Sequence, residues 1–313
     1  MFKASKIEFK KALFVLAVLA IILPFFTFAG NTKKIYVDTK AGDTQDGSSD
    51  HPYKTIDQAL KKANDHTKIF VGRGTYKENL IVPKGVKIYG NDRDETIIKA
   101  QNDDDSAVYL NGGSELYKLT IKDGKNGVKV ADGGRVKIIR CKIAENDKDG
   151  VIIYAGSLDD KNKVTISETD IEQNGRNGIF SEKRNIIIYK STIDNNGSDG
   201  ASFEAGTKAW IEGSTFENNS ASGMKAKLDN AQIFTKGNKY INNKREGLEV
   251  NAYGATGRID INKSKFENNG NYGISRVQRK TFSANIWNGL TIENTLFSKL
   301  EKGGLSGVFG IFN

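Results

Sequence analysis

The stretch Thr169-Asp-Ile-Glu-Gln-Asn-Gly-Arg-Asn-Gly-Ile179 decides the fold, because its pattern returns along most of the chain. The marker of the pattern is a glycine followed by an apolar segment. Seven units carry this marker, at Gly127, Gly150, Gly178, Gly200, Gly223, Gly247 and Gly273. The steps between them are 23, 28, 22, 23, 24 and 26 residues. A period of this length with no helical phase is typical of a solenoid whose repeats cover one another's core.

Six of the seven units also place two residue types at fixed distances before the glycine. One large apolar residue stands seven positions earlier, at Ile143, Ile171, Ile193, Phe216, Tyr240 and Phe266. An asparagine stands four positions earlier, at Asn146, Asn174, Asn196, Asn219, Asn243 and Asn269. Further back, apolar residues alternate with outward ones, as in Val164 and Ile166, which is strand spacing. We expect the asparagines to form a structural ladder, because asparagine tolerates sharp turns and stacked amides can hydrogen-bond between repeats.

Composition and charge limit the classes of partner. The 313 residues carry a formal net charge of +9. The first 29 residues contribute +3 of this (four lysines against one glutamate), which leaves +6 for the remainder. A moderately basic surface suits an anionic polysaccharide, whereas nucleic acid is disfavoured because no basic cluster is interleaved with aromatic residues in the sequence. Cys141 is the single cysteine, so no disulfide forms within the chain, and we interpret it as structural.

The N-terminal residues predict export. Four lysines precede the apolar run from Ala12 to Phe28, and a small-residue cleavage site follows. Residues 1–29 are therefore predicted to be a secretory signal peptide, with an uncleaved membrane anchor as the alternative. We expect a secreted or cell-surface monomer that has no membrane contact after cleavage. The remaining chain is divided into an N-terminal cap with the first rungs (30–92), the repeats (93–300) and a C-terminal cover (301–313).

The cap segment contains the one helical pattern of the sequence. Apolar residues fall at helical spacing between Thr55 and Asn64, with Thr55 as the expected N-cap. Upstream, Asp43, Asp46 and Asp50 surround a glycine turn. Their carboxylates make a weak candidate for calcium, the one cofactor that the sequence suggests, but a turn explains the same residues.

A family resemblance rests on the cap and on the repeats together. The cap motifs are Tyr36-Val-Asp38, Asp46-Gly-Ser48, Pro52-Tyr-Lys-Thr-Ile56, Ile69-Phe-Val71, Gly74-Thr-Tyr76 and Gly85-Val-Lys-Ile-Tyr-Gly90. They resemble the N-terminal cap of secreted right-handed parallel β-helix proteins of the pectin-lyase-like superfamily, which includes alginate epimerases and certain pectate lyases. The resemblance implies an all-β, single-stranded right-handed parallel β-helix of nine or ten rungs, with three strands per rung and a short N-terminal capping helix. It also implies a second column of small residues in the turn between the second and third strands, at Cys141, Thr169, Ser191, Ser214, Asn238, Ser264 and Thr295.

The outward side of the strands that follow each glycine is the candidate functional face. Residues at matching outward positions of neighbouring strands should lie about 4.8 Å apart there. They would form one patch of aromatic rings, carboxylates, amines and an amide, made of Tyr154, Phe180, Glu182, Glu204, Lys225, Lys227, Glu249 and Asn251. We call these eight residues the Gly-Ile patch. Tyr154, Phe180, Glu249 and Asn251 are predicted to bind a ligand.

Several functions remain open for this patch. Aromatic rings can stack on sugars, and amines can pair with uronate groups. Glu182 and Glu204 could lie near the carboxyl separation of about 5 Å that retaining glycosidases use. Lys225 or Lys227 could instead act as the base of a polysaccharide lyase, with calcium neutralising the uronate. The plain alternative is a solvated sheet face on a structural or adhesive rod. The Asp-Pro-His motif of alginate epimerases and the Gly-His-Gly motif of polygalacturonases are both absent, so no catalytic residue of those relatives can be assigned here.

Overall fold

The computed structural model describes residues 32–251, 256–277, 289–306 and 311–312. The chain divides into two units, residues 1–32 and residues 33–313, and the fold described below belongs to the second. The predicted signal peptide, residues 1–29, lies outside the described residues. Within the described ranges, no helix is long and apolar enough to cross a membrane.

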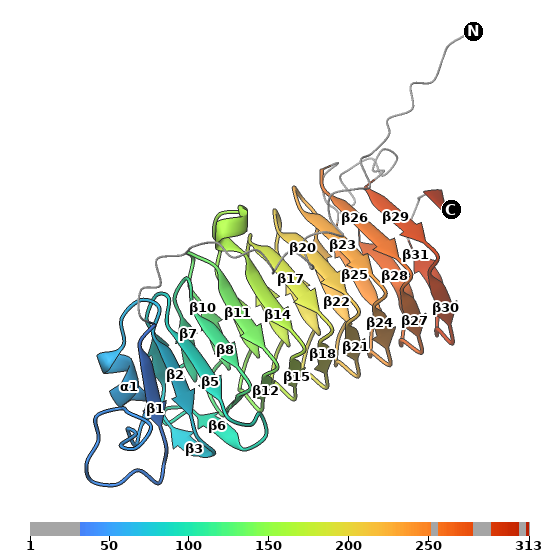
Figure 1. Ribbon diagram of the computed structural model, residues 1–313. Helices are drawn as coiled ribbons and strands as arrows, with labels where there is room; N and C mark the ends of the chain where they lie inside the picture. Colours follow the sequence, from blue (N-terminus) through green and yellow to red (C-terminus); the bar gives the residue numbers. More distant parts are fainter. Residues whose placement is uncertain (1–31, 252–255, 278–288, 307–310, 313) are drawn as a thin grey trace. The chain divides into compact units, whose positions relative to one another are not determined.

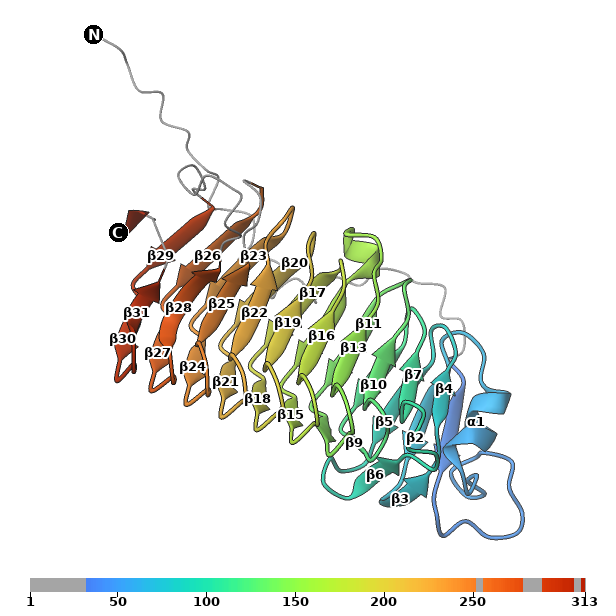
Figure 2. The same cartoon turned by 180° about the vertical axis from the view of Figure 1, so that it is seen from behind.

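The described residues form three parallel sheets, and the strands of each sheet follow one another along the stack in Figures 1 and 2. Sheet A has twelve strands, in the order β1 (Lys34–Val37), β2 (Lys68–Val71), β5 (Lys87–Gly90), β8 (Glu115–Tyr117), β11 (Val136–Ile139), β14 (Val164–Ser167), β17 (Asn185–Tyr189), β20 (Lys208–Glu212), β23 (Gln232–Lys236), β26 (Arg258–Asn262), β29 (Leu290–Glu293) and β32 (Ile311–Phe312). Sheet B has ten strands, in the order β3 (Gly74–Lys77), β6 (Thr96–Lys99), β9 (Thr120–Lys122), β12 (Lys142–Ala144), β15 (Asp170–Glu172), β18 (Thr192–Asp194), β21 (Thr215–Glu217), β24 (Lys239–Ile241), β27 (Lys265–Glu267) and β30 (Leu296–Ser298). Sheet C has ten strands, in the order β4 (Leu80–Val82), β7 (Val108–Leu110), β10 (Val128–Val130), β13 (Val151–Ile153), β16 (Ile179–Ser181), β19 (Ala201–Phe203), β22 (Met224–Lys227), β25 (Leu248–Asn251), β28 (Tyr272–Val277) and β31 (Gly303–Ser306).

Each rung contributes one strand to each sheet in turn, which confirms the predicted parallel β-helix. The ten strands of sheets B and C agree with the expected nine or ten rungs. Register is strict: Val164 pairs with Ile186 and Ile166 with Ile188 on neighbouring strands of sheet A. A slip of one residue would turn every apolar side chain outward, so the alternating pattern fixes this register.

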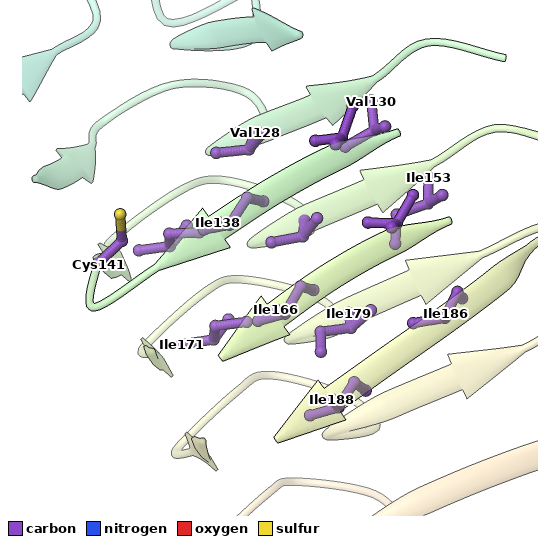
Figure 3. Close-up of a cluster of buried hydrophobic side chains, with 14 of the residues drawn as sticks. Val128, Val130, Ile138, Cys141, Ile153, Ile166, Ile171, Ile179, Ile186 and Ile188 are labelled. Carbon is purple, nitrogen blue, oxygen red and sulfur yellow. The ribbon is translucent and has the colours of Figure 1, made fainter. Parts of the chain in front are cut away.

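The inward residues of the three sheets form one continuous core. Figure 3 shows Ile166, Ile171 and Ile179, one from each sheet of a single rung, gathered on the inner side of their strands. Cys141 lies in the same interior, where burial raises the pKa of its thiol to about 12, so it remains a protonated packing group. In the later rungs of sheet B, aromatic side chains replace aliphatic ones at the inward position. Their rings stack on one another, from Phe216 through Tyr240 and Phe266 to Phe297.

The six asparagines form a continuous buried ladder beside sheet B. The side-chain amide of each donates to the side-chain oxygen of the next at 2.8–3.0 Å, from Asn146 to Asn269. Each amide from Asn174 onward also donates to a backbone carbonyl of the preceding rung, as Asn219 does to Ile193 at 3.1 Å. The smaller column from Cys141 to Ser264 is also present, because the backbone N–H of each residue donates to the side-chain oxygen of the next residue in the column.

The marker glycines are required by close approach between rungs. A Cβ atom built on Gly178 would lie 2.5 Å from Ile193 Cγ2, 2.6 Å from the carbonyl oxygen of Gly200 and 2.8 Å from Asn196 Nδ2. The backbone of each unit therefore packs directly on the ladder and backbone of the next. A side chain here would have to push two rungs apart.

We expect Gly178→Ala to lower the free energy of unfolding by about 2–3 kcal/mol, as overpacking of a rigid core does. Gly133→Ala is the matched control, because a Cβ there meets nothing within 4 Å. Denaturant titration of both variants checks this. Equal stabilities for the two variants would contradict the close-packing explanation.

The helix α1 (Ile56–Lys62) packs at the N-terminal end of the stack against β1 and β4 (Figure 1). Thr55 is its N-cap, as predicted, and forms a capping box with Gln58. Glu78 completes the cap from outside the helix, because its carboxylate accepts the backbone N–H groups of Ile56 and Asp57 at 2.9 and 2.7 Å. Ile56, Ala59 and Leu60 are buried in the core.

The C-terminal residues that the structure describes continue the coil. Strand β31 pairs with β28 in sheet C, and β32 pairs with β29 in sheet A. The described part of the expected cover, residues 301–313, is thus an extension of two sheets. The asparagine ladder ends earlier, at Asn269, because Leu300 occupies the next position of the column.

Candidate functional site

The strands that carry the Gly-Ile patch lie side by side in sheet C (Figure 2). Phe180 of β16 is in register with Ile152 on one side and Ser202 on the other. Lys225 of β22 pairs with Glu249 of β25, and Lys227 with Asn251. The order of the outward residues along the stack is thus the one expected from the repeat. Their contacts divide the patch into two halves of different character.

The first half consists of aromatic rings and cations. The ammonium of Lys129 lies 5.0 Å from the ring centroid of Tyr154 and 5.6 Å from that of Tyr109. The guanidinium of Arg176 lies 5.6 Å from the ring centroid of Phe180. These side chains are partly exposed, so each cation presents charge beside an apolar ring. Such a surface offers stacking area and positive charge to the same ligand.

Arg176 is held rigidly by a buried carboxylate. Its Nε and Nη2 atoms donate to the two oxygens of Asp149 at 3.0 and 2.5 Å. Asn177 donates its backbone N–H and its amide to the same carboxylate. Arg176 and Asn177 belong to the fold-deciding stretch, and through Asp149 they place a guanidinium over Phe180. The sequence pattern did not reveal that Asp149 positions Arg176, because Asp149 lies one repeat before Arg176 in the chain.

The second half consists of ion pairs that compensate one another. Lys227 donates to both oxygens of Glu204 at 2.7 and 2.6 Å. Glu249 lies 3.1 Å from Lys225 and 3.1 Å from Arg245. Both lysines proposed as bases are therefore held in ion pairs with carboxylates. An ammonium cannot accept the proton that a lyase base removes.

Glu249 and Asn251 differ from the prediction of an exposed, ligand-binding position. Their side chains are buried, at 3% and 4% relative exposure. For Glu249 the reason is packing, since Lys225 and Arg245 close over its carboxylate from neighbouring positions. Both residues of β25 are thus withdrawn from the outward surface that Tyr154 and Phe180 share.

Glu182 and Glu204 are on adjacent strands, but their carboxylates are engaged in opposite directions along the stack. Glu182 accepts the backbone N–H of Ala155, from the preceding rung, at 2.9 Å. Glu204 is bonded to Lys227 of the following rung. Each carboxylate is thus engaged by a different neighbouring rung, and the pairing of Glu182 with Glu204 stays a prediction. A different carboxyl, Asp199, has its pKa raised by burial, although Ser222 donates a backbone hydrogen bond to it and Lys225 lies nearby.

The three aspartates proposed as weak calcium ligands serve separate contacts. Asp46 accepts the backbone N–H of Ser48 at 2.8 Å, which forms the predicted turn. Asp43 lies 4.0 Å from the ammonium of Lys54. Asp50 is exposed beside Ser49. Across the ranges that the structure describes, no three histidine, cysteine or acidic residues are grouped so that they could hold a metal ion.

Sheet B carries a column of carboxylates on its outward side. Asp194 lies in register between Glu172 and Glu217. Burial raises the pKa of Asp194 to about 6, and repulsion from the two glutamates adds to this rise, while Asn195 opposes it by donating a hydrogen bond at 2.5 Å. The column is a source of electrostatic strain at neutral pH.

Asp194→Asn should stabilise the protein at neutral pH. In the unfolded chain this carboxyl ionises near its ordinary pKa of 3.8, whereas in the folded chain it ionises at about 6. Below about pH 4 both states are protonated and no penalty exists; stability falls as the pH rises from about 4 to 6 and stays lower above that. After allowance for solvent screening we expect a gain of on the order of 1 kcal/mol at pH 7 and none at pH 4. Denaturant titration at both pH values checks this, with the exposed Asp147→Asn as control. A gain of the same size at both values would contradict it.

Comparison with known proteins places this geometry in a family. The family model "Right handed beta helix region" matches residues 126–297, more than half of the chain. The sequence matches none of the curated proteins with which it was compared.

Solved structures share the fold at low sequence identity. An alginate lyase from a Paenibacillus species superposes with a TM-score of 0.65 and 13% identity, over 89% of this chain and 99% of the other. The pectate lyase Pel9A gives a TM-score of 0.58 and 14% identity, over 84% and 79%. The catalytic unit of an alpha-1,3-glucanase from Streptomyces thermodiastaticus gives 0.50 and 12%, over 89% and 68%. All three are named as enzymes that act on polysaccharides. With its parallel three-sheet coil, its asparagine ladder and the matching family model, the chain belongs to the right-handed β-helix family and has the pectin-lyase-like fold.

Proposed function

We propose that the protein binds an extracellular or cell-wall polysaccharide along the outward face of sheet C. The observation that carries this proposal is the first half of the Gly-Ile patch, where Lys129 and Arg176 lie against the rings of Tyr154 and Phe180. A sugar ring stacks on an aromatic face, and a neighbouring ammonium or guanidinium pairs with its acidic substituent. The three structural neighbours, all named as polysaccharide enzymes, support the ligand class.

An anionic polymer fits this surface best. Arg176 is neutralised by Asp149, but Lys129 has no ion pair among the described residues, so the aromatic half has excess positive charge. The net charge of +6 outside the first 29 residues has the same sign. We further propose, from residues 1–29 alone, that the protein works outside the cell or at its surface.

Cleavage of the same polymer is the second candidate, as a lyase or a hydrolase. The observation in its favour is Asp199, a carboxyl whose raised pKa suits a proton donor and which lies near Lys225. Against it stand the ion pairs of Lys225, Lys227 and Glu204, which occupy the groups that the sequence nominated. Binding without turnover is therefore the function that the geometry supports best.

The test is a panel of anionic polysaccharides, alginate and polygalacturonate among them, incubated with the protein with and without calcium. Retention without product supports binding. Unsaturated products would show a lyase, and new reducing ends alone would show a hydrolase. In the second and third cases, Glu204→Ala and Asp199→Asn decide which carboxyl takes part. No retention and no product on any polymer would overturn both proposals and leave the structural or adhesive rod.

Tyr154→Ala combined with Phe180→Ala should weaken retention at least about tenfold, because each aromatic contact contributes on the order of 1 kcal/mol beyond its buried area. Tyr189→Ala is the matched control, since Tyr189 is an exposed aromatic residue on sheet A. The midpoint of thermal unfolding shows whether the variants remain folded. A folded double variant in which the number of binding sites and their affinities are both unchanged would remove sheet C as a binding face.

A further inference from the structure

A second column of aromatic rings lies on a different face, at the start of sheet A. Tyr36, Phe70, Tyr89 and Tyr117 occupy matching outward positions of β1, β2, β5 and β8. The rings of Tyr36 and Phe70 stack at 5.4 Å between centroids, and those of Phe70 and Tyr89 at 5.6 Å, both with 22° between planes. Tyr117 continues the column at 5.8 Å with a tilted ring. All four side chains are partly exposed.

A column of lysines runs beside these rings. Lys34, Lys68 and Lys87 are in register on the same three strands, two residues before the aromatic positions and on the same outward side. Neighbouring strands are about 4.8 Å apart, so three positive charges are stacked at close spacing. In the described part of the chain none of the three forms an ion pair, whereas Lys137, farther along the column, pairs with Glu115 at 3.7 Å.

Stacked like charges without counter-charges destabilise a sheet. One carboxylate, Glu115 of β8, is in register with Lys87, but its ion pair is with Lys137 on the other side. Lys34 and Lys68 have only other lysines at the registered positions of the neighbouring strands. A ligand that supplies the missing negative charge would relieve the repulsion. Amines and rings have the same order on β1, β2 and β5, so the ligand would itself be a repeating, acidic chain.

The far end of the column adds cationic groups. Arg140 donates to the hydroxyl of Tyr117 at 3.0 Å and lies 5.9 Å from its ring centroid. The ammonium of Lys118 lies 5.7 Å from the same ring. Arg140 is held in place by Glu168 at 2.8 Å. The rings are therefore flanked by positive charge at Tyr117 as well as along the lysine column.

We propose that this surface, which we call the sheet A platform, is a second binding site for an acidic polysaccharide, separate from the Gly-Ile patch. The polysaccharide lies along the stack, perpendicular to the strands of Figure 1, with its sugar rings on Tyr36, Phe70 and Tyr89. Its carboxylate or sulfate groups pair with Lys34, Lys68 and Lys87. The platform does not depend on the proposed function of sheet C, because the two sets share no residue and belong to different sheets.

The experiment counts binding sites for short acidic oligosaccharides by isothermal titration calorimetry. The probes are an oligogalacturonate, which carries carboxylates, and a sulfated oligosaccharide of equal length. Lys68→Gln with Lys87→Gln tests the lysine column, and Phe70→Ala tests the rings. The matched control is Lys239→Gln with Lys244→Gln, two exposed lysines away from sheets A and C that give the same change of net charge.

We expect the platform variants to weaken binding at this site roughly fivefold to tenfold at low salt, since an exposed ion pair contributes only modestly to affinity. The salt dependence of binding should fall as well, because fewer ions are released. The control variant should change neither the affinity at this site nor its salt dependence. The probe that binds more tightly identifies the acidic group. Tyr154→Ala with Phe180→Ala should leave the platform site intact, so that loss of the sheet C site and loss of the platform are measured apart.

Two results would overturn the proposal. One is a Lys68→Gln and Lys87→Gln variant that is folded, by its thermal unfolding midpoint, and binds both probes as the unaltered protein does. The other is tighter binding of a single-stranded oligonucleotide than of either oligosaccharide, lost in the same variants, because stacked aromatics beside lysines also suit nucleic acid bases.

Discussion

Replacing Arg184 by alanine is expected to lower the free energy of unfolding by about 3 kcal/mol or more. Arg184 is fully buried, and it donates to four backbone carbonyls: those of Ala131 and Gly134 at 3.0 Å, Tyr154 at 3.3 Å and Asn162 at 2.8 Å. Alanine would leave these acceptors without their donor in the interior, and each costs about 1–3 kcal/mol.

The arginine joins three successive rungs. Its carbonyl partners lie in the segments that follow β10 and β13, including the 3₁₀ helix η1 (Asp160–Asn162), while Arg184 itself precedes β17. Burial lowers the pKa of its guanidinium, and the charges of Asp132 and Asp159 oppose this. No carboxylate is hydrogen-bonded to Arg184 among the described residues, so its hydrogen bonds all go to backbone carbonyls. Arg184→Lys should therefore recover little, because an ammonium lacks the planar fork that reaches four acceptors.

Hydrogen exchange gives the decisive measurement for Arg184. Each rung of a solenoid contacts its neighbours, so the loss of protection should appear first between β10 and β17 and spread outward. Denaturant titration gives the accompanying fall in stability. Lys183→Ala, an exposed neighbour, is the control. Uniform loss of protection over the whole coil, or stability equal to the control, would show that Arg184 does not join these rungs.

Asn219→Ala should cost about 4 kcal/mol, because this residue is in the middle of the ladder. Its side-chain oxygen accepts the backbone N–H and the amide of Asn196 at 3.1 and 3.0 Å. Its amide donates to Asn243 at 3.0 Å and to the carbonyl of Ile193 at 3.1 Å. Alanine leaves several buried partners unpaired on both neighbouring rungs.

Asn219→Asp separates shape from hydrogen bonding. Aspartate keeps the size of the side chain but, when ionised, it cannot donate to Asn243 or to Ile193, and its charge is buried. We expect a loss at pH 7 comparable with that of alanine and a smaller loss under acid conditions, where the carboxyl is protonated. Ser220→Ala, one residue along and exposed, is the control. Denaturant titration of all three variants checks the order; an alanine variant as stable as the control would mean that the ladder contributes nothing.

The sequence predicted the rungs well because every rung repeats the same physical requirement. Inward residues such as Ile166 and Ile188 must alternate, Asn174 must meet Asn196, and Gly178 must leave room for the next rung. Each requirement recurs at a nearly fixed spacing, so it is visible without coordinates. The same regularity gave the order of outward residues on sheet C.

The contacts of those outward residues were not predictable in the same way. The spacing placed Glu182 beside Glu204, but rotamers and neighbours decided that one carboxylate turns to Ala155 and the other to Lys227. Likewise Glu249 is at an outward position, yet Arg245 and Lys225 enclose it. A repeat pattern fixes on which side of a strand a residue lies, and it does not fix what covers it.

By itself, then, the sequence determined the parallel coil, its inward core and its ladder, because these follow from local alternation repeated along the chain. The tertiary structure decided how charges and rings from different rungs combine. Lys34, Lys68 and Lys87 are separated by unequal numbers of residues, so no period connects them. They meet only because β1, β2 and β5 pair in register after loops of different length have folded. Arg184 likewise can donate to its four carbonyl acceptors only when three rungs are stacked. The acceptors lie in segments that are distant in the sequence and come together only in the packed backbone.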